Sequence, residues 1–526
     1  MTRASGPLEI DQDAPWWRRP TVKALQRSVH ADAANDDLGD RRDNDRNRLH
    51  KNESIHLSAI STAQLYTPST VEQLTGAINK LPAHPDFKRT IREELSERRR
   101  RHGGGKVFEI GTATHRGRII DRQGFYDDDL PDQFLQVWLT AYFPMPATSV
   151  LVATFVLREE SGSLYDILRT DVPAMIEDVR VHVHGRFGKL ISGVPFARPR
   201  RAGFSWYREP PELVKRRLAS QFILDHESAA LAWLDKRFPG RMSDEDRRDR
   251  TTLPLLLTHR SEPLRDRSRG LAPVGLDYEV APWVSAVRGA WKLVLDPVVV
   301  MSDFRGLFAA RRGSICGTTH HAGSSSSRSA GFQFHRMFSS SIAQLAIVDL
   351  LHLYEKGLNE TRDAAGKRGK LRGGVGTAKY LDRYLLSDGF DIDAIVAEVT
   401  NYEFEGVLPY WLKGGMHFDL SQLDESEVDE EIRSKTLAGE LDESIRAAAD
   451  RLGSVWSSTH QTIASSAQLK QSVASIRLSL TNTILSLVAI FVAVVSIVVA
   501  CSSQSNAPQT APPAPVFLSP TTISKP

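Results

Sequence analysis

Two histidines, His182 and His184, are the first residues whose type and spacing could do chemistry. They belong to the stretch VRVHVH (residues 179–184), whose alternation predicts a strand with both imidazoles on one face. Two histidines in this arrangement can bind one zinc or iron ion when a third ligand comes from elsewhere. Arg180 shares their face and would repel a cation, so a solvated strand face is the competing interpretation.

Cys316 is the second candidate, because His320 and His321 follow it closely. A neighbouring imidazolium lowers the pKa of a thiol and makes it a better nucleophile. The sequence indicates no third group that would orient the pair, so a structural cysteine is the alternative. The other cysteine, Cys501, lies in an apolar segment far along the chain. This usage argues against a disulfide framework and is typical of a reducing compartment.

The third candidate is a basic, glycine-rich stretch, GKRGKLRGGVGTAK (residues 366–379). Its cations are Lys367, Arg368, Lys370, Arg372 and Lys379. Backbone N–H groups and cations in such a loop can hold phosphates or anionic lipid head groups. The spacing is not that of a P-loop, and nucleic acid is not indicated because no aromatic residues are interleaved with the cations. A solvated loop is the alternative.

No motif in the sequence identifies a reaction, a substrate or a cofactor. The segment SDFRG (residues 302–306) has part of a kinase signature but lacks its catalytic-loop and phosphate-loop partners. Neither a serine-hydrolase elbow nor a paired Cys-x-x-Cys occurs. Whether the chain is an enzyme is therefore left open at the level of sequence.

The helices and strands expected around these residues indicate an α+β cytosolic region. Strands are expected at residues 106–113, 134–143, 150–157, 179–184 and 252–257. A helix is expected over residues 211–238, because it begins at a proline pair and is followed by Pro239-Gly240. Ser69 and Glu72 form a capping-box pattern, which predicts another helix start. Helices and strands do not alternate regularly, which favours α+β over α/β.

Composition divides the chain into seven ranges. They are a disordered segment (1–60), a mixed α+β domain (61–310), a Ser/Gly-rich loop or junction (311–331), a mainly helical part (332–420), an amphipathic helical stalk (421–477), a transmembrane helix (478–501) and a disordered Pro/Ser/Thr-rich tail (502–526). The net charge of +3 is small beside 67 basic and 64 acidic residues, so the overall charge indicates no class of partner.

The range 478–501 carries no charged residue and predicts a single transmembrane helix. As a helix it reaches about 36 Å, which exceeds the hydrocarbon core of a bilayer, about 30 Å thick. Lys470 and Arg477 precede it, whereas the next charge after it is Lys525. The positive-inside rule therefore places the large N-terminal part in the cytoplasm and the tail on the opposite side.

Small and apolar residues at alternating spacings of three and four precede this span and form a seam. The seam consists of Leu441, Ile445, Ala448, Leu452 and Val455, and after Thr459 of Ile463, Ser466, Leu469, Val473, Ile476 and Leu480. Such a stripe predicts a coiled coil with a second copy of the chain. The alternative is that the helix packs against the body of its own chain.

These observations favour a membrane-tethered, non-enzymatic scaffold or sensor. Its expected partners are the lipid bilayer, a second copy held through stalk and span, and anionic lipid head groups. The alternative is a membrane-anchored enzyme with an unrecognised site built on His182, His184 and Cys316.

In layout, a mixed cytosolic domain leading through a long helix into the membrane resembles the CorA magnesium channels. Members of that family have two spans joined by a Gly-Met-Asn loop, whereas this chain has one predicted span and no such motif. A channel built from single spans would need a ring of them, with Asn482, Ser486 and Ser496 facing the pore. The sequence therefore favours transport less than tethering.

Overall fold

The structure is a computed structural model in which the chain divides into two compact units, Met1–Trp456 and Ser457–Pro526. It describes residues 37–100, 107–116, 124–183, 202–261, 273–274, 283–285, 291–295, 306–316, 327–368, 388–399, 416–418 and 436–504. The first unit mixes helices and strands, and the second contains an apolar helix. The coarse architecture expected from the sequence is therefore confirmed.

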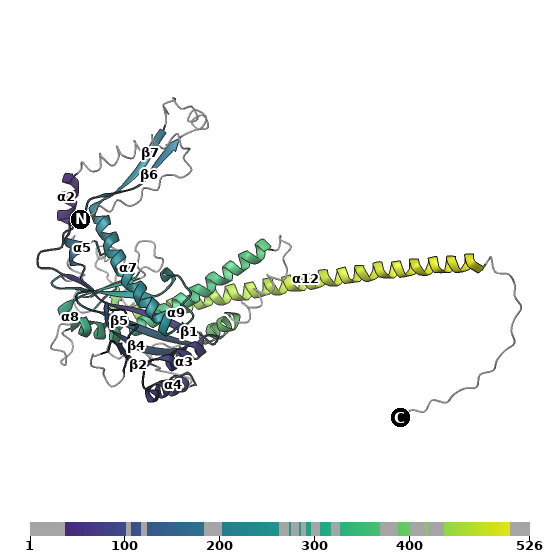
Figure 1. The fold of residues 1–526 in the computed structure, drawn as a ribbon, viewed down its shortest axis with the longest axis horizontal. Helices are drawn as coiled ribbons and strands as arrows, with labels where there is room; N and C mark the ends of the chain where they lie inside the picture. Colours follow the sequence, from purple (N-terminus) through teal and green to yellow (C-terminus); the bar gives the residue numbers. More distant parts are fainter. Residues whose placement is uncertain are drawn as a thin grey trace, which may run out of the picture. The chain divides into compact units, whose positions relative to one another are not determined.

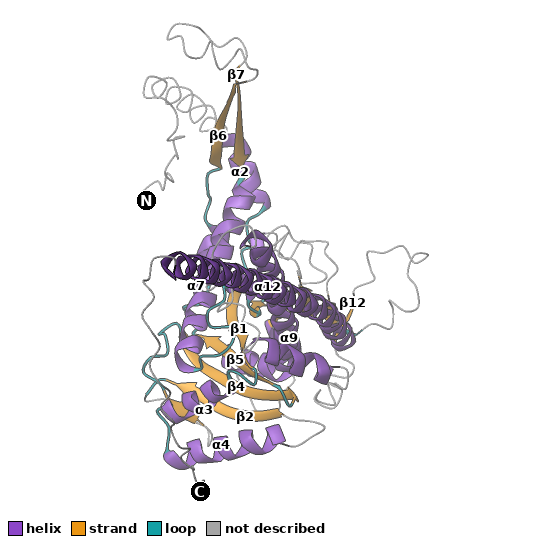
Figure 2. Ribbon diagram, turned by 90° about the vertical axis from the view of Figure 1, so that its right-hand side faces the viewer, coloured by secondary structure: helices purple, strands orange, loops and turns teal. Residues whose placement is uncertain are grey.

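One mixed sheet of ten strands organises the first unit (Figure 1). In spatial order its strands are β12 (Met416–Phe418), β9 (Trp283–Ser285), β10 (Trp291–Leu295), β11 (Gly306–Arg311), β8 (Thr252–Thr258), β1 (Ile55–Tyr66), β5 (Thr148–Leu157), β4 (Phe134–Met145), β2 (Val107–Thr114) and β3 (Gly124–Tyr126). Neighbours run antiparallel except in the pairs β11–β8 and β2–β3. Figure 2 shows β1, β5, β4 and β2 side by side.

Helices cover both faces of this sheet and create two separate hydrophobic cores. On one face lie α9 (Ser327–Arg368) and the first part of α12 (Leu437–Gln504). On the other lie α3 (Val71–Lys80), α4 (Pro85–Arg100) and α7 (Pro211–Arg237). Because both faces are covered, the central strands are buried along nearly their whole length.

The central strand β1 was not predicted, and the range 1–60 assigned to disorder overlaps it. The segment IHLSAISTAQLY contains polar residues that suggest an exposed chain, but the fold buries and pairs them. Thr62 Oγ1, for example, donates to the carbonyl of Thr251 at 2.8 Å. Upstream, α2 (Asp37–Arg46) is fixed by Asn44, whose amide donates to the carbonyl of Val172 at 2.8 Å. Residues 37–60 therefore belong to the folded unit, which corrects the prediction.

Most of the other predicted elements are confirmed within a few residues. The structure contains β2, β4, β5, β8 and α7 where alternation and end signals placed them. The exception is α9, which begins at Ser327 inside the predicted Ser/Gly-rich junction. Gly331 allows this early start, because a Cβ atom there would lie 2.6 Å from Cγ2 of Val156 in β5. Helix α9 thus lies directly on the sheet.

A separate two-stranded sheet consists of β6 (Met175–Val183) and β7 (Ala202–Glu209). The strands pair antiparallel, with Val181 opposite Phe204 and His182 opposite Gly203. Strand β6 contains most of the predicted strand 179–184.

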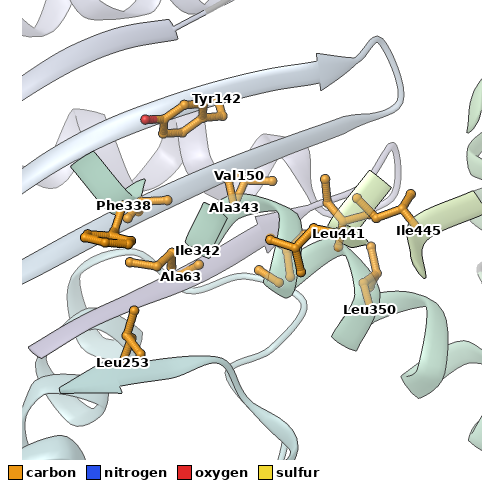
Figure 3. Packing of buried hydrophobic residues seen from close by; sticks show 14 of the residues in the cluster. Ala63, Tyr142, Val150, Leu253, Phe338, Ile342, Ala343, Leu350, Leu441 and Ile445 are labelled. Carbon is orange, nitrogen blue, oxygen red and sulfur yellow. The ribbon is translucent and has the colours of Figure 1, made fainter. Parts of the chain in front are cut away.

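The part of α12 that belongs to the first unit packs into the core on the face covered by α9. Leu441, Ile445 and Leu452 are buried there, and Figure 3 shows Leu441 and Ile445 close to Leu350 of α9. These residues form the first half of the seam. That half therefore packs against its own chain, which is the alternative left open by the sequence.

Candidate functional site

The side chains of the histidine pair and of the cysteine lie outside what the structure describes. The backbone of His182 lies in β6, and His184 lies outside the described part of the chain. Cys316 is the last residue of α8 (Arg312–Cys316), while His320 and His321 lie outside the described residues. Within the residues that the structure describes, no group of three or more His, Cys, Asp or Glu side chains could hold a metal ion. The roles assigned to these residues remain predictions.

The basic stretch has a similar outcome. Lys367 and Arg368 are the last two residues of α9, whereas Lys370, Arg372 and Lys379 lie outside the described ranges. Anion binding by this stretch remains a prediction.

The structure instead gathers buried polar side chains in places that the sequence did not nominate. The first is His335 of α9, which lies between β4 and β5. Its Nε2 is 2.8 Å from Thr140 Oγ1, and its Nδ1 is 2.8 Å from Thr154 Oγ1. The Thr154 hydroxyl in turn contacts Ser61 Oγ of β1. One imidazole therefore links a helix to three strands through hydroxyl groups.

Burial decides what this imidazole can do. It lowers the pKa of His335 to about 3, so the ring is neutral at physiological pH. A neutral ring donates from one nitrogen and accepts at the other, which matches a threonine hydroxyl on each side. Ser61 and Thr154 are fully buried, so a substrate in solvent does not reach these hydroxyls. The arrangement positions α9 on the sheet and does not form an open catalytic site.

The second gathering surrounds Asp391, which is fully buried in the helical residues 388–399. Its carboxylate accepts hydrogen bonds from Thr67 Oγ1 at 2.6 Å, from the backbone N–H of Ser69 at 3.0 Å and from Ser69 Oγ at 2.5 Å. The Tyr354 hydroxyl of α9 donates a further bond at 3.1 Å. Burial raises the pKa of Tyr354 far above its usual range, so this phenol remains a donor.

This cluster corrects the predicted capping box at the start of α3. Ser69 does not cap the helix with Glu72, because its N–H and hydroxyl bind Asp391. The N-cap residue is Thr70, whose side chain makes no capping hydrogen bond. Asp391, distant in the sequence, thus fixes the junction between β1 and α3.

Charged groups next to this junction are also paired internally. The Arg241 guanidinium lies 5.2 Å from the centre of the Tyr354 ring, and its Nη2 is 3.4 Å from Asp388 Oδ2. Nearby, Arg250 binds Asp235 through two bonds of 2.7 and 2.9 Å. Such mutual pairing is typical of a network that holds elements together.

Glu227 of α7 is a further buried ionisable group. Burial raises its pKa to about 7, and Arg247 Nη1 lies 3.1 Å from its Oε2. This carboxyl therefore titrates near neutral pH. A single glutamate within a helix forms no recognisable motif, so the sequence alone could not have identified Glu227 as a buried titratable group.

The feature with the clearest physical meaning is the apolar segment Leu478–Val499 in the second unit. It is long and apolar enough to cross a membrane, and none of it is buried in the structure. Its large side chains are exposed, from 44% at Val495 to 69% at Phe491. A row of such side chains is strongly unfavourable in water.

Comparisons with models of known protein families, with curated proteins and with solved structures give no match to this chain. Among the features of the described residues, the exposed apolar segment is the one that a water-soluble fold does not explain.

Proposed function

We propose that the protein is a single-pass membrane protein whose first unit acts as a non-enzymatic scaffold or sensor at the cytoplasmic face of a bilayer. The observation that carries the proposal is the exposure of Leu478–Val499 along its whole length. On the scale for inserting a helix into a bilayer, each Leu, Ile, Phe or Val at the centre of the helix contributes about 0.3–0.6 kcal/mol in favour of the membrane. Summed over this segment, insertion into lipid outweighs the cost of placing one helix there.

Two hydroxyl groups of the segment, those of Thr483 and Ser496, fit a lipid environment. Thr483 Oγ1 donates to the carbonyl of Ser479 and Ser496 Oγ donates to the carbonyl of Val492, both at 2.8 Å. These side chains therefore satisfy themselves on their own helix, as polar groups in hydrocarbon must.

The charges beside the segment support one orientation. Lys470 and Arg477 come before it, and Lys525 is the next charge after it. Because positive residues favour the cytoplasmic side, the first unit is cytoplasmic and the tail lies on the opposite side.

The described interior of the first unit fits a structural scaffold. Its described polar clusters, around His335 and Asp391, pair elements of the fold with one another. In this proposal, anionic lipid head groups bind the basic stretch at residues 366–379. The seam beyond residue 456 binds a second copy of the chain, since its first half is already used within the first unit.

Placing charges in the centre of the segment tests the anchor. Each arginine at the middle of a transmembrane helix costs about 2.5–3.5 kcal/mol. The double variant Leu487→Arg/Phe491→Arg should therefore move from the membrane pellet to the soluble fraction after alkaline extraction. Leu218→Arg is the matched control, because Leu218 is also an exposed leucine on a helix, α7, and it should stay with the membrane. A wild-type chain found in the soluble fraction would contradict the proposal.

Cysteine labelling tests the orientation. In a Cys316→Ser/Cys501→Ser background, Thr522→Cys places one thiol in the tail. A membrane-impermeant maleimide should label it in intact cells. If labelling requires permeabilisation, the proposed orientation is wrong, although the anchor itself stands.

A further inference from the structure

The helical residues 388–399 contact two parts of the first unit, one on each side. On one side, Asp391 binds Thr67 and Ser69 at the junction of β1 and α3. On the other, the same helix meets Trp456 of α12. Trp456 is the last residue of the first unit, so α12 leaves the unit there.

The contact with Trp456 is specific in both chemistry and shape. The indole Nε1 donates to Asp393 Oδ1 at 2.6 Å. The ring lies against Gly389, where an added Cβ would be 2.6 Å from Cη2 and 3.1 Å from Cζ2 of the indole. The first distance is shorter than real Cβ contacts and the second is tighter than most, so the ring occupies space that any larger residue at 389 would fill. About one turn before Trp456 in α12, an added Cβ at Gly453 would lie 3.2 Å from Val396 Cγ1.

The contact with the β1–α3 junction leaves little freedom for the helix to move alone. Ile392 and Ile395 are fully buried in the same core as α9, and Asp391 is the acceptor for three side-chain hydroxyls. If the helix shifted away, the buried hydroxyls of Thr67 and Tyr354 would lose this acceptor, and a buried hydroxyl without its partner carries a desolvation penalty. Because Asp391 and Asp393 are two residues apart, a shift at one contact displaces the other.

We propose that the clip, defined as residues 388–399 together with Trp456, transmits displacement of α12 to the β1–α3 junction. Release of Trp456 withdraws Asp391 and opens this junction. The inference rests on the proposed function, because a bilayer or a second copy acting on the segment after residue 456 supplies the displacement. It assigns the sensing role to a defined element of the first unit.

The decisive variant is Gly389→Ala in the full-length protein purified in lipid nanodiscs. Its added methyl group displaces the Trp456 ring, and native-state hydrogen exchange of residues 66–78 should accelerate about tenfold. Gly313→Ala is the matched control, because nothing lies within 4 Å of an added Cβ at that position. Exchange at the junction should be unchanged in the control. If Gly389→Ala accelerates exchange only in residues 388–399 and α12, the proposal is overturned.

A milder variant tests the same contact in case Gly389→Ala prevents the protein from folding. Trp456→Phe keeps an aromatic ring on Gly389 but removes the bond to Asp393, so exchange at the junction should accelerate by a smaller factor, about threefold. No change at the junction in this variant, with faster exchange at residues 388–399, would also overturn the proposal.

Hydrogen exchange also distinguishes failure of the clip from failure of the proposed membrane anchor. If the wild-type chain fails to remain with membranes, the anchor is wrong, and the exchange experiment can be repeated on the protein in buffer. Accelerated exchange there would support the clip without a membrane, and unchanged exchange at the junction would overturn it.

Discussion

Helix α9 and the second unit's part of α12 each contain a stretch that is long and apolar enough to cross a membrane. In α9 this stretch is Ser327–Glu360, whose most apolar 18 residues are 78% buried, whereas Leu478–Val499 is not buried at all. Their polar side chains differ in the same way. His335 and Gln344 of α9 bond to other elements, the latter to Asp442 of α12 at 2.9 Å. The hydroxyls of Thr483 and Ser496 bond to their own helix.

This difference is the one expected between a core helix and the membrane helix that we propose for Leu478–Val499. A core helix can carry groups that need partners, because neighbouring elements supply them. A helix in lipid has no such neighbours and must satisfy its own polar groups. The position of the hydrogen-bond partners is therefore the informative property.

The largest expected effect comes from placing one charge in each helix. Ile342 of α9 is fully buried, so Ile342→Asp introduces an unpaired buried charge and should unfold the first unit. Val492→Asp, in the exposed segment, should leave the first unit folded and weaken membrane retention only. Protease resistance of the first unit reports the difference. Equal resistance of the two variants would contradict the claim that only α9 belongs to a core.

The next effect lies within α12 itself. Leu452 is fully buried in the first unit, and Leu480 in the second unit is 59% exposed. Leu452→Ala should lower the free energy of unfolding of the first unit by about 2–4 kcal/mol, because it leaves a cavity. Leu480→Ala should change it by less than about 0.5 kcal/mol. Denaturant titration of the full-length chain in detergent measures both values. Similar losses of unfolding free energy in the two variants would mean that both residues lie in one core.

A smaller effect is expected from the buried imidazole of His335, which α9 holds against the sheet. The folded pKa of His335, about 3, lies below its usual value of 6.5, so the unfolded state takes up a proton first as the pH falls. Stability is therefore lost as the pH falls from 6.5 towards 3, by about 2 kcal/mol at pH 5. His335→Gln should flatten this slope in unfolding measurements made between pH 5 and 8. An unchanged slope would mean that the folded protein admits the protonated ring.

The smallest effect concerns Glu227 on the opposite face of the sheet and has the opposite sign. Its folded pKa, about 7, lies above the usual 4.5, so the unfolded state loses its proton first as the pH rises. Stability is lost between pH 4.5 and 7. Glu227→Gln should be more stable than the wild type at pH 8 by about 1–2 kcal/mol, less than the full pKa shift implies because the Arg247 ion pair is lost. A destabilised variant would show that the ion pair outweighs burial.

The sequence predicted an element correctly where its polar residues are exposed and its apolar residues are buried. Strands β4 and β5 and helix α7 were placed correctly, since their apolar runs and proline signals match their burial. Strand β1 was missed because Ser61, Thr62 and Gln64 suggest solvent, although the fold buries all three. Partners that pair such residues come from other elements, and local patterns do not reveal them.

The polar clusters were beyond sequence reasoning for the same reason. Spacing nominated His182 and His184, which are close in the chain. The groups that the structure brings together are far apart, as with Thr67 and Asp391, which are 324 residues apart. Only the folded sheet and its helices create that proximity.

The central claim is that Leu478–Val499 lies in lipid and that Ser327–Glu360 does not. Photolabelling in liposomes with a carbene-generating probe confined to the hydrocarbon core tests it most directly, with labelled peptides identified by mass spectrometry. We expect labelling within residues 478–499 and none within residues 327–360. Labelling of residues 327–360, or of neither stretch, would contradict the claim.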